Sequence, residues 1–126
     1  LHAQAMIGPI LEMAAKADVA FVGIGDLGAD APLFVDGFIS REELQSLHDA
    51  GAVGEIVGWA FDADGRIIEG ITNDRVASAM IPDRETSLVI AIAKGAKKLP
   101  GIAAAIRGGL INGLITDELT AEKLLN

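Results

Sequence analysis

The sequence predicts an α/β fold in which a mostly parallel sheet is flanked by helices. Residues 88–93 form an unbroken apolar run rich in β-branched side chains, and residues 19–25 form a second apolar run. Such runs are typical of strands that are buried on both faces of a parallel sheet. A short cationic, glycine-containing turn at residues 94–98 follows the first of these runs, and apolar residues at helical spacing come next. Ligands of open α/β sheets bind at the carboxyl ends of strands, so we expect an anionic small molecule at this turn.

The composition limits the classes of protein to which the chain can belong. Its 126 residues suffice for one domain with one core, and a hydrophobic content of 51% argues against disorder. The net charge of −8 would repel nucleic acid phosphates, so we expect no direct binding to DNA. Without cysteine there is neither a disulfide framework nor a thiolate metal site. No apolar run is long enough to span a bilayer and no signal peptide is evident, which predicts a cytoplasmic protein.

The N-terminal segment predicts a helix, a strand and a glycine-rich loop. Residues 1–17 have helical periodicity, with Gly8-Pro9 marking either a kink or the true start of the helix. The strand 19–25 runs into G-I-G-D-L-G at residues 23–28, a formal match to the dinucleotide-binding pattern. That motif requires a helix immediately after it, whereas a loop follows here, and nearby aspartates would repel a phosphate. We therefore favour a loop that lines a pocket.

A capping box predicts the next helix. Ser40 and Glu43 have the spacing at which each side chain binds the other residue's amide, so we expect a helix over residues 41–49. Gly51 is the expected left-handed stop. His48 lies near the end of this helix, where it is expected to be a surface residue or to face the helix dipole.

The middle of the chain predicts a hairpin and a polar turn. Residues 52–61 are expected to form one strand, which turns at D-A-D-G (residues 62–65) and returns through residues 66–68. The D-x-D-G sequence lacks the other ligands of a calcium loop, so that interpretation is rejected. In the following polar cluster, Asn73 or Asp74 caps a short helix toward Met80, or else Asp74 or Arg75 organises the mouth of a pocket.

The C-terminal part contains the candidate ligand-binding turn. Lys94, Lys97 and Lys98 surround Gly95, and they are either solvated lysines or cations that neutralise a phosphate or carboxylate together with amides at the helix start. A helix with an early Pro100 follows and ends at Gly108-Gly109. A strand at residues 110–115 and a helix at 118–125, capped by Thr116 or Asp117, complete the chain.

Other chemistries find no support in the sequence. There is no G-x-S-x-G nucleophile elbow and no Walker A motif, and the two histidines stand without cysteines. No pair of carboxylates stands out as an acid–base pair. The residues by themselves indicate a soluble α/β ligand-binding domain with no cofactor and no metal.

Six motifs occur along the chain in the order in which a known family has them. They are G-I-G after the first strand, A-G-A-V-G-E-I-V-G (50–58), F-D-A-D-G-R (61–66), N-D-R-V (73–76), V-I-A-I-A-K-G-A-K-K (89–98) and N-G-L-I-T-D-E-L-T-A-E-K-L-L (112–125). Together they resemble the effector-binding domain of sugar-responsive bacterial transcriptional regulators of the SorC type. That family includes the deoxyribonucleoside regulator, often grouped as DeoR, and the central glycolytic gene regulator.

The resemblance implies a Rossmann-like fold similar to glucosamine-phosphate deaminase and ribose-phosphate isomerase. It implies that a phosphorylated sugar is bound and not turned over, with Lys98 on the phosphate and Glu55 on the sugar hydroxyls. Gly23 and Gly25 would form the rim of the pocket, and Gly95 the turn beneath the phosphate. Lys94 replaces a glycine of the family pattern, so the backbone approach there is expected to differ. An isomerase or deaminase of the same fold is the alternative.

The resemblance also implies that residues 1–126 are only the later part of the effector domain. The N-terminal helix-turn-helix of the family, through which DNA would be bound, has no counterpart here, and the chain begins at Leu1 and not at Met. We therefore expect a fragment with an incomplete pocket and an exposed sheet edge. The full protein is expected to form a homo-oligomer.

Overall fold

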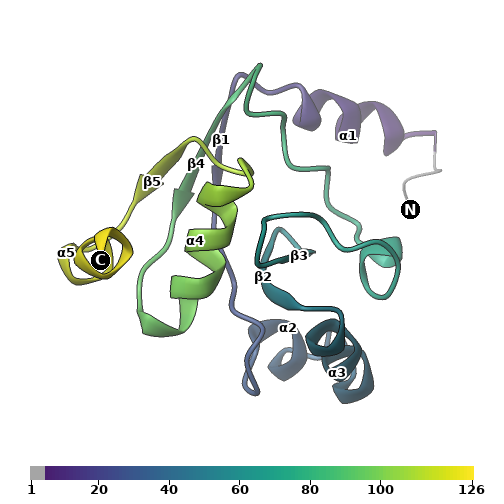
Figure 1. Ribbon diagram of the computed structural model, residues 1–126. Coiled ribbons are helices and arrows are strands. Elements are labelled where there is room, and N and C mark those ends of the chain that lie inside the picture. The colour runs from purple at the N-terminus through teal and green to yellow at the C-terminus, as the bar shows by residue number, and fades with distance from the viewer. Residues whose placement is uncertain (1–4) are drawn as a thin grey trace.

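The computed structural model describes residues 5–126 as a three-stranded parallel sheet and a separate two-stranded hairpin (Figure 1). The parallel sheet has the order β1-β4-β5 and consists of β1 (Val19–Val22), β4 (Leu88–Ile92) and β5 (Gly113–Ile115). The antiparallel hairpin pairs β2 (Ala52–Ile56) with β3 (Trp59–Asp62). The helices are α1 (Gly8–Ala15), α2 (Pro32–Val35), α3 (Arg41–Asp49), α4 (Leu99–Arg107) and α5 (Glu118–Leu125). No helix within the described residues is long and apolar enough to cross a membrane. The predicted α/β class and parallel sheet are confirmed.

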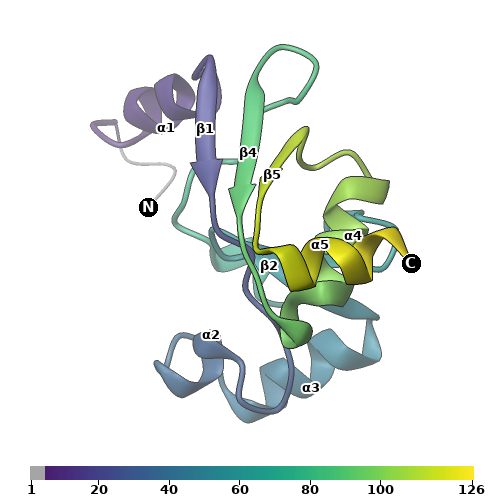
Figure 2. The ribbon, with the colours of Figure 1, turned by 90° about the vertical axis from the view of Figure 1, so that its left-hand side faces the viewer.

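One face of the parallel sheet carries the main core. Val22, Val89 and Ala91 from the strands belong to one buried cluster with Ile102 of α4 and Phe61 of β3. The hairpin and α4 approach closely because glycines face each other, and a Cβ added at Gly54 would lie 3.1 Å from the Gly101 Cα. The arrows of β1 and β4 both point toward the end where α2 and α3 lie (Figure 2). The loop that leaves β1 meets the hairpin, since Gly25 forms an isolated bridge with Glu55.

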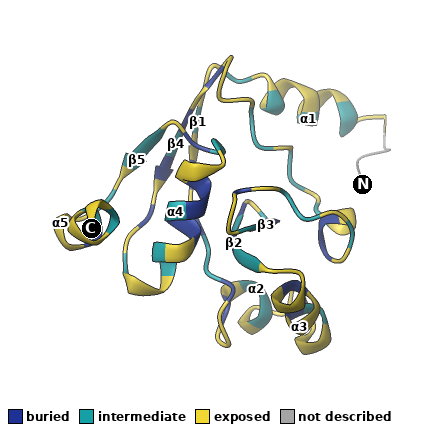
Figure 3. Ribbon diagram, in the orientation of Figure 1, coloured by how far each residue is buried: buried dark blue, intermediate teal, exposed yellow. Residues whose placement is uncertain are grey.

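The opposite face of the sheet is open, which corrects one prediction. The run at residues 88–93 was expected to be buried on both faces. Instead Phe21 is 64% exposed and Leu88 and Ile92 are each 53% exposed, as the yellow segments of the strands indicate (Figure 3). The apolar character of the strands is real, but nothing in residues 5–126 covers this face.

The N-terminal elements are shorter than predicted. The first helix begins at Gly8 with Pro9 in its first turn, so Gly8-Pro9 marks the start of the helix and not a kink. Residues 1–4 of the predicted helix lie outside the described residues. The first strand ends at Val22, and a four-residue helix, α2, occupies Pro32–Val35, so Pro32, the last residue of the segment 29–32 that was expected to be loop, is helical. No helix follows directly on residues 23–28, as a dinucleotide-binding motif would require.

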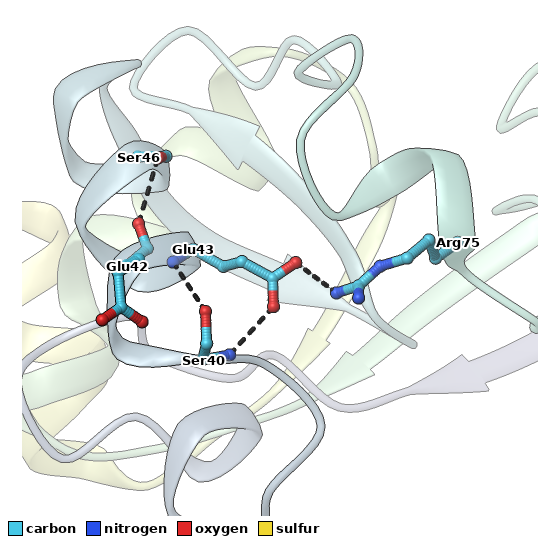
Figure 4. Close-up of polar contacts among 5 residues, drawn as sticks. All are labelled: Ser40, Glu42, Glu43, Ser46 and Arg75. Carbon is cyan, nitrogen blue, oxygen red and sulfur yellow. Dashed lines mark hydrogen bonds and ion pairs between the residues drawn. The ribbon is translucent and has the colours of Figure 1, made fainter.

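The capping box of α3 is confirmed. The Ser40 Oγ accepts from the Glu43 amide at 3.1 Å, and the Glu43 Oε1 accepts from the Ser40 amide at 2.9 Å (Figure 4). Gly51 follows the helix with φ +86°, the left-handed stop that was predicted. Leu44 and Leu47 are the buried residues of this helix.

The prediction of one strand over residues 52–61 is wrong. The chain reverses at Val57-Gly58, where φ is +46° and +93°, and the predicted turn at residues 62–65 is a second reversal. The residues around the first turn, I-V-G-W at 56–59, carry no charged side chain, and the group that stabilises the turn is a side chain from the strand before it. The Glu55 Oε2 accepts a 2.7 Å hydrogen bond from the Gly58 amide.

The polar cluster after the hairpin does not extend to a helix ending at Met80. Only Asn73–Arg75 forms a 3-10 turn, and Asn73 is buried and caps no helix. Its Oδ1 accepts from the Ala60 amide at 2.9 Å, while its Nδ2 donates to the carbonyls of Ala60 at 3.0 Å and Ile68 at 2.6 Å. Asn73 therefore acts as a bridge that holds β3 to the returning chain.

The C-terminal predictions are confirmed with one change. A short 3-10 turn, Ala96–Lys98, precedes α4, which carries Pro100 in its first turn and stops at Gly108. The final strand is only Gly113–Ile115, shorter than the predicted 110–115. Asp117 caps α5 by accepting from the Thr120 amide at 2.9 Å.

Candidate functional site

The carboxyl end of β1 is joined to the hairpin through Gly25 and Glu55. The two residues form an antiparallel bridge, with Gly25 N donating to the Glu55 carbonyl at 2.9 Å and Glu55 N donating to the Gly25 carbonyl at 3.0 Å. The Glu55 carboxylate lies over Gly25, since a Cβ added there would sit 2.0 Å from Oε1. The structure thus brings two of the predicted site residues into direct contact.

The Glu55 carboxylate is held in place from a second direction. Its Oε2 accepts from the Gly58 amide, and this glycine has a positive φ that residues with a side chain rarely adopt. Oε1 accepts no hydrogen bond from the described part of the chain. A half-buried carboxylate fixed in this way presents one oxygen to accept from a ligand hydroxyl.

The carboxyl end of β4 forms a tight turn whose geometry depends on Gly95. Gly95 has φ +108°, its amide donates to the Thr120 Oγ1 at 3.0 Å, and its carbonyl accepts from the Lys98 amide at 3.1 Å. Lys98 is half-buried, whereas Lys94 and Lys97 are exposed. The three lysines of the turn are therefore not equivalent in their surroundings.

Asp117 couples the last helix to this turn. Hydrogen bonds from the Thr120 side chain and amide lower the pKa of Asp117 below its ordinary value, and the nearby positive charge of Lys94 acts in the same direction. Thr120 in turn binds the Gly95 amide. Lys94 thus has a carboxylate neighbour within the chain.

A cleft of about 490 Å³ lies beside the glycine loop. Residues 26–30 form one wall, so only residues 26–28 of the predicted loop at 23–28 line the cleft, and Val53, Lys97 and Pro100 contribute to the other wall. Lys98 and Glu55 do not line this cleft, and neither do Gly23 and Gly25. The structure therefore groups the predicted residues into a Gly25–Glu55 pair and a Gly95–Lys98 turn, with Lys97 facing the cleft between the loop and α4.

His48 makes a contact that no sequence pattern revealed. Its Nε2 is hydrogen-bonded to the Leu27 carbonyl, 21 residues earlier in the chain, and the residue lines the same cleft. The residue is exposed, as expected. Its partner is a loop carbonyl, which ties α3 to the glycine loop.

A second cleft, of about 470 Å³, lies between α2 and the hairpin turn. Arg75 and Thr72 line it, and Arg75 forms an ion pair at 2.5 Å with the Glu43 carboxylate of the capping box (Figure 4). Of the two interpretations of the polar cluster, Arg75 fits the one that places it at the mouth of a pocket. Asp74 is exposed and lines neither cleft.

The described residues offer no arrangement for metal chemistry. No group of three histidine, aspartate or glutamate side chains in residues 5–126 could hold a metal ion. Instead, the Glu55 carboxylate of β2 lies against the loop that follows β1, and a basic turn follows the adjacent parallel strand β4. This arrangement defines the class of α/β domains that bind a small polar ligand.

Within this class, the chain belongs to the family described as "Putative sugar-binding domain", whose model matches residues 1–126. The erythritol catabolism regulatory protein EryD of Brucella abortus is 34% identical over 125 residues, which are 99% of this chain and 40% of that protein. The transcriptional regulator LsrR of Klebsiella pneumoniae is 36% identical over 129 residues, with the same shares. The chain thus spans about two fifths of the length of these relatives.

Solved structures agree with the family. A DeoR family transcriptional regulator from Listeria monocytogenes superimposes with a TM-score of 0.89 at 26% identity, covering 98% of this chain and 50% of that one. The full-length sorbitol operon regulator SorC of Klebsiella pneumoniae gives a TM-score of 0.88 at 28% identity, covering 99% of this chain and 41% of that one. The predicted family and the Rossmann-like α/β fold are confirmed.

Proposed function

We propose that residues 1–126 are the later part of the effector-binding domain of a sugar-phosphate-responsive transcriptional regulator. The single observation that supports this most is the match of the whole chain to a sugar-binding domain family whose similar proteins are regulators. The DNA-binding domain would lie in the part of the relatives that this chain does not span. The acidic net charge of −8 agrees with a segment that senses a ligand and does not itself contact DNA.

In this proposal Lys98 binds the phosphate and Glu55 the sugar hydroxyls. Lys98 follows Gly95 at the carboxyl end of β4, where amides and a cation can neutralise an anion together. Glu55 lies on β2 and is bridged to Gly25 in the loop after the adjacent strand β1, and its Oε1 is free to accept from a hydroxyl. Gly23 leaves room at the rim for the ligand, and Gly25 leaves room for the Glu55 carboxylate.

Lys94 takes a different part in the same turn. The family pattern has glycine at this position, and here the lysine side chain is exposed and acts on Asp117. Because its charge already has a carboxylate neighbour, we assign Lys94 an indirect role. Its positive charge adds to the electrostatic attraction of the phosphate without contacting it. Lys98 remains the direct contact.

Ligand binding would control DNA binding through a population shift. A sugar phosphate that prefers one arrangement of the full protein moves its subunits toward that arrangement, and the affinity for DNA changes as a consequence. Such a protein would be a cytoplasmic homo-oligomer without a catalytic cofactor.

The decisive experiment uses the full-length protein and compares Lys98→Ala with Lys97→Ala. A screen of ribose 5-phosphate, glucosamine 6-phosphate and their unphosphorylated parents first identifies a ligand by thermal shift. Loss of a charge-assisted contact should weaken the binding of the phosphosugar by about 10- to 100-fold in Lys98→Ala. Lys97→Ala removes the same charge from the same turn and should change affinity by less than about threefold. Equal effects of the two substitutions would contradict the assignment of Lys98.

A turnover assay and the thermal-shift screen separate the other two interpretations of the fold. Formation of product from ribose 5-phosphate or glucosamine 6-phosphate would show an isomerase or deaminase and overturn the choice of a regulator. The absence of stabilisation by any phosphosugar would instead favour a domain that serves only in contacts between subunits.

A further inference from the structure

The second cleft, between α2 and the hairpin turn, takes no part in the proposed function. Its volume of about 470 Å³ falls within the range of roughly 300–1,000 Å³ that is usual for small-molecule sites. Neither Glu55 nor Lys98 lines it, and it shares no lining residue with the cleft beside the glycine loop. It is therefore a separate candidate site for a small molecule.

The walls of the second cleft are mostly apolar. Leu33 of α2 lines it together with Phe38 and Ile39, which follow this helix, and Val57 and Val76 line it from the hairpin turn and the polar cluster. Phe38 is 72% exposed and Val57 is 44% exposed, so part of this apolar surface is in contact with water. Its removal from water favours the binding of a molecule with an apolar body.

One polar side chain beside this apolar surface is buried without a hydrogen bond. Thr72 lines the second cleft and is 5% exposed, and its Oγ1 has no hydrogen-bond partner among residues 5–126. The Thr116 Oγ1 is the other such atom in this part of the chain, but Thr116 lines neither cleft. Buried polar atoms almost always have a partner, so the Thr72 hydroxyl indicates that a molecule in the cleft supplies one. Rotation about χ1 exchanges its hydroxyl and methyl positions and can turn the hydroxyl toward such a molecule.

Arg75 provides the charge of the second cleft. It is the one charged residue among the described lining residues, and its side chain is 56% exposed. The Glu43 carboxylate lies 2.5 Å from its Nη2, and no other ion pair or hydrogen bond engages the Arg75 side chain within residues 5–126. A guanidinium has five N–H donors, so most of them remain available. Their planar arrangement matches the two oxygens of a carboxylate.

We propose that the second cleft binds a small carboxylic acid with an apolar body. The carboxylate contacts the Arg75 guanidinium and the Thr72 hydroxyl, and the apolar body packs against Phe38 and Val57. A carboxylate in contact with the guanidinium is closer to Arg75 than to Glu43, so the attraction exceeds the repulsion. A phosphate with two negative charges would be repelled more strongly by Glu43, which already offsets the charge of Arg75. The site does not depend on the proposed function.

Methyl NMR spectroscopy of the full-length protein tests the proposal with three probes. 4-Phenylbutanoate combines a carboxylate with an apolar body, 4-phenylbutanamide has the same body without the charge, and acetate has the charge without the body. At about 10 mM, 4-phenylbutanoate should shift the methyl signals of Ile39 and Val57, and the other two probes should bind at least about tenfold more weakly. Ile115 is the control, because it is exposed but lines neither cleft. Equal binding of the amide, no shift at Ile39 and Val57, or an equal shift at Ile115 would overturn the proposal.

Three charge variants test the position of the carboxylate. Arg75→Gln should weaken the binding of 4-phenylbutanoate by about tenfold. Arg66→Gln removes the same charge from an exposed residue that lines neither cleft, and it should change affinity by less than about threefold. Glu43→Gln removes the carboxylate that repels the ligand, while glutamine still serves in the capping box, so affinity should rise by about twofold or more. Equal effects of the two arginine substitutions, or no rise in Glu43→Gln, would overturn the proposal.

Thr72→Val separates the contact with the ligand from folding. Valine has nearly the same shape without the hydroxyl, so the loss of an unpartnered buried group should leave the melting temperature unchanged or raise it. The binding of 4-phenylbutanoate should nevertheless weaken by about 3- to 10-fold. A lower melting temperature would show that the hydroxyl has a partner inside the protein, and an unchanged affinity would show that it does not contact the ligand. Either result would overturn the proposal. None of these measurements needs a sugar phosphate, so failure of the proposed function and failure of this site are distinguishable.

Discussion

Glu55 owes its position to the absence of a side chain at Gly25. The two backbones exchange hydrogen bonds of 2.9 and 3.0 Å, and the Glu55 carboxylate occupies the space where a Cβ of residue 25 would lie. The Gly58 amide holds the other carboxylate oxygen. The carboxylate is therefore positioned by the backbone at Gly25 and at Gly58 before any ligand arrives, which is the preorganisation that a polar binding group requires.

Gly25→Ala should displace this carboxylate. A methyl group 2.0 Å from Oε1 forces the Glu55 side chain to another rotamer, and its hydrogen bond to Gly58 is lost. If Glu55 binds sugar hydroxyls, affinity for the phosphosugar identified in the screen should fall by about 10- to 100-fold, the loss expected for hydrogen bonds to a charged group. Isothermal titration calorimetry on the full-length protein measures the change.

Gly23→Ala is the matched control for the same loop. No atom lies within 4 Å of a Cβ added at Gly23, so the substitution leaves Glu55 where it is. We expect an unchanged melting temperature and a smaller loss of affinity than in Gly25→Ala. If both variants lose affinity equally, the loop itself, and not the position of Glu55, controls binding.

Asn73→Ala should destabilise the fold strongly. The Asn73 side chain satisfies the Ala60 amide and the carbonyls of Ala60 and Ile68, and the residue is 6% exposed. Its removal leaves buried backbone groups unpaired, which costs about 2–4 kcal/mol. Urea denaturation followed by circular dichroism gives the free energy of unfolding.

Two further variants test whether the stabilisation comes from the side-chain amide of Asn73. Asp74→Ala changes the exposed neighbour and should alter stability by less than about 0.5 kcal/mol. Asn73→Asp keeps the acceptor for the Ala60 amide but places a carboxylate against two carbonyl oxygens, so it should be no more stable than Asn73→Ala. A stable Asn73→Asp protein would contradict the bridging role.

The parts of this fold that the sequence predicts are those determined by local chemistry. Ser40 and Glu43 fix the start of α3 by themselves, and Gly51 fixes its end, so both could be predicted from residue spacing. The turn at Val57-Gly58 could not, because Val57 is an unusual residue for a positive φ and the stabilising group is the Glu55 side chain. The role of Asn73 could not be predicted either. Its partners are backbone groups of Ala60 and Ile68, and the apolar side chains of these residues give no indication of a hydrogen bond.

The candidate site could be predicted only one loop at a time. Periodicity identified the two strand ends, but the direct contact between Gly25 and Glu55 joins residues 30 positions apart, and no local pattern encodes it. The apolar run around Leu88 indicates burial on both faces, which residues 5–126 do not provide. The strand pattern therefore does not by itself predict the open face that the structure shows over residues 5–126.

Asp117 should make the stability of the C-terminal part depend on pH at the acid end. Hydrogen bonds from Thr120 and the charge of Lys94 lower its pKa below the ordinary value of 3.8. The unfolded chain therefore binds a proton more readily than the folded one, and the stabilisation is present above pH 3.8 and is lost as the pH falls through the lowered pKa. Asp117→Asn keeps a capping oxygen but cannot titrate in this range.

The comparison of these two proteins isolates Asp117 from other acids. The Glu43 pKa is also lowered, chiefly by the hydrogen bond from the Ser40 amide, so the melting temperature of the native protein alone does not report on Asp117. The difference in melting temperature between the native protein and Asp117→Asn cancels the contribution of Glu43. That difference should shrink as the pH falls below 3.8, and a difference independent of pH would mean that Asp117 titrates alike in the folded and unfolded chains. Thr120→Val should flatten the pH dependence in part, because it removes the hydroxyl that connects Asp117 with the Gly95 amide but leaves the Thr120 amide in place.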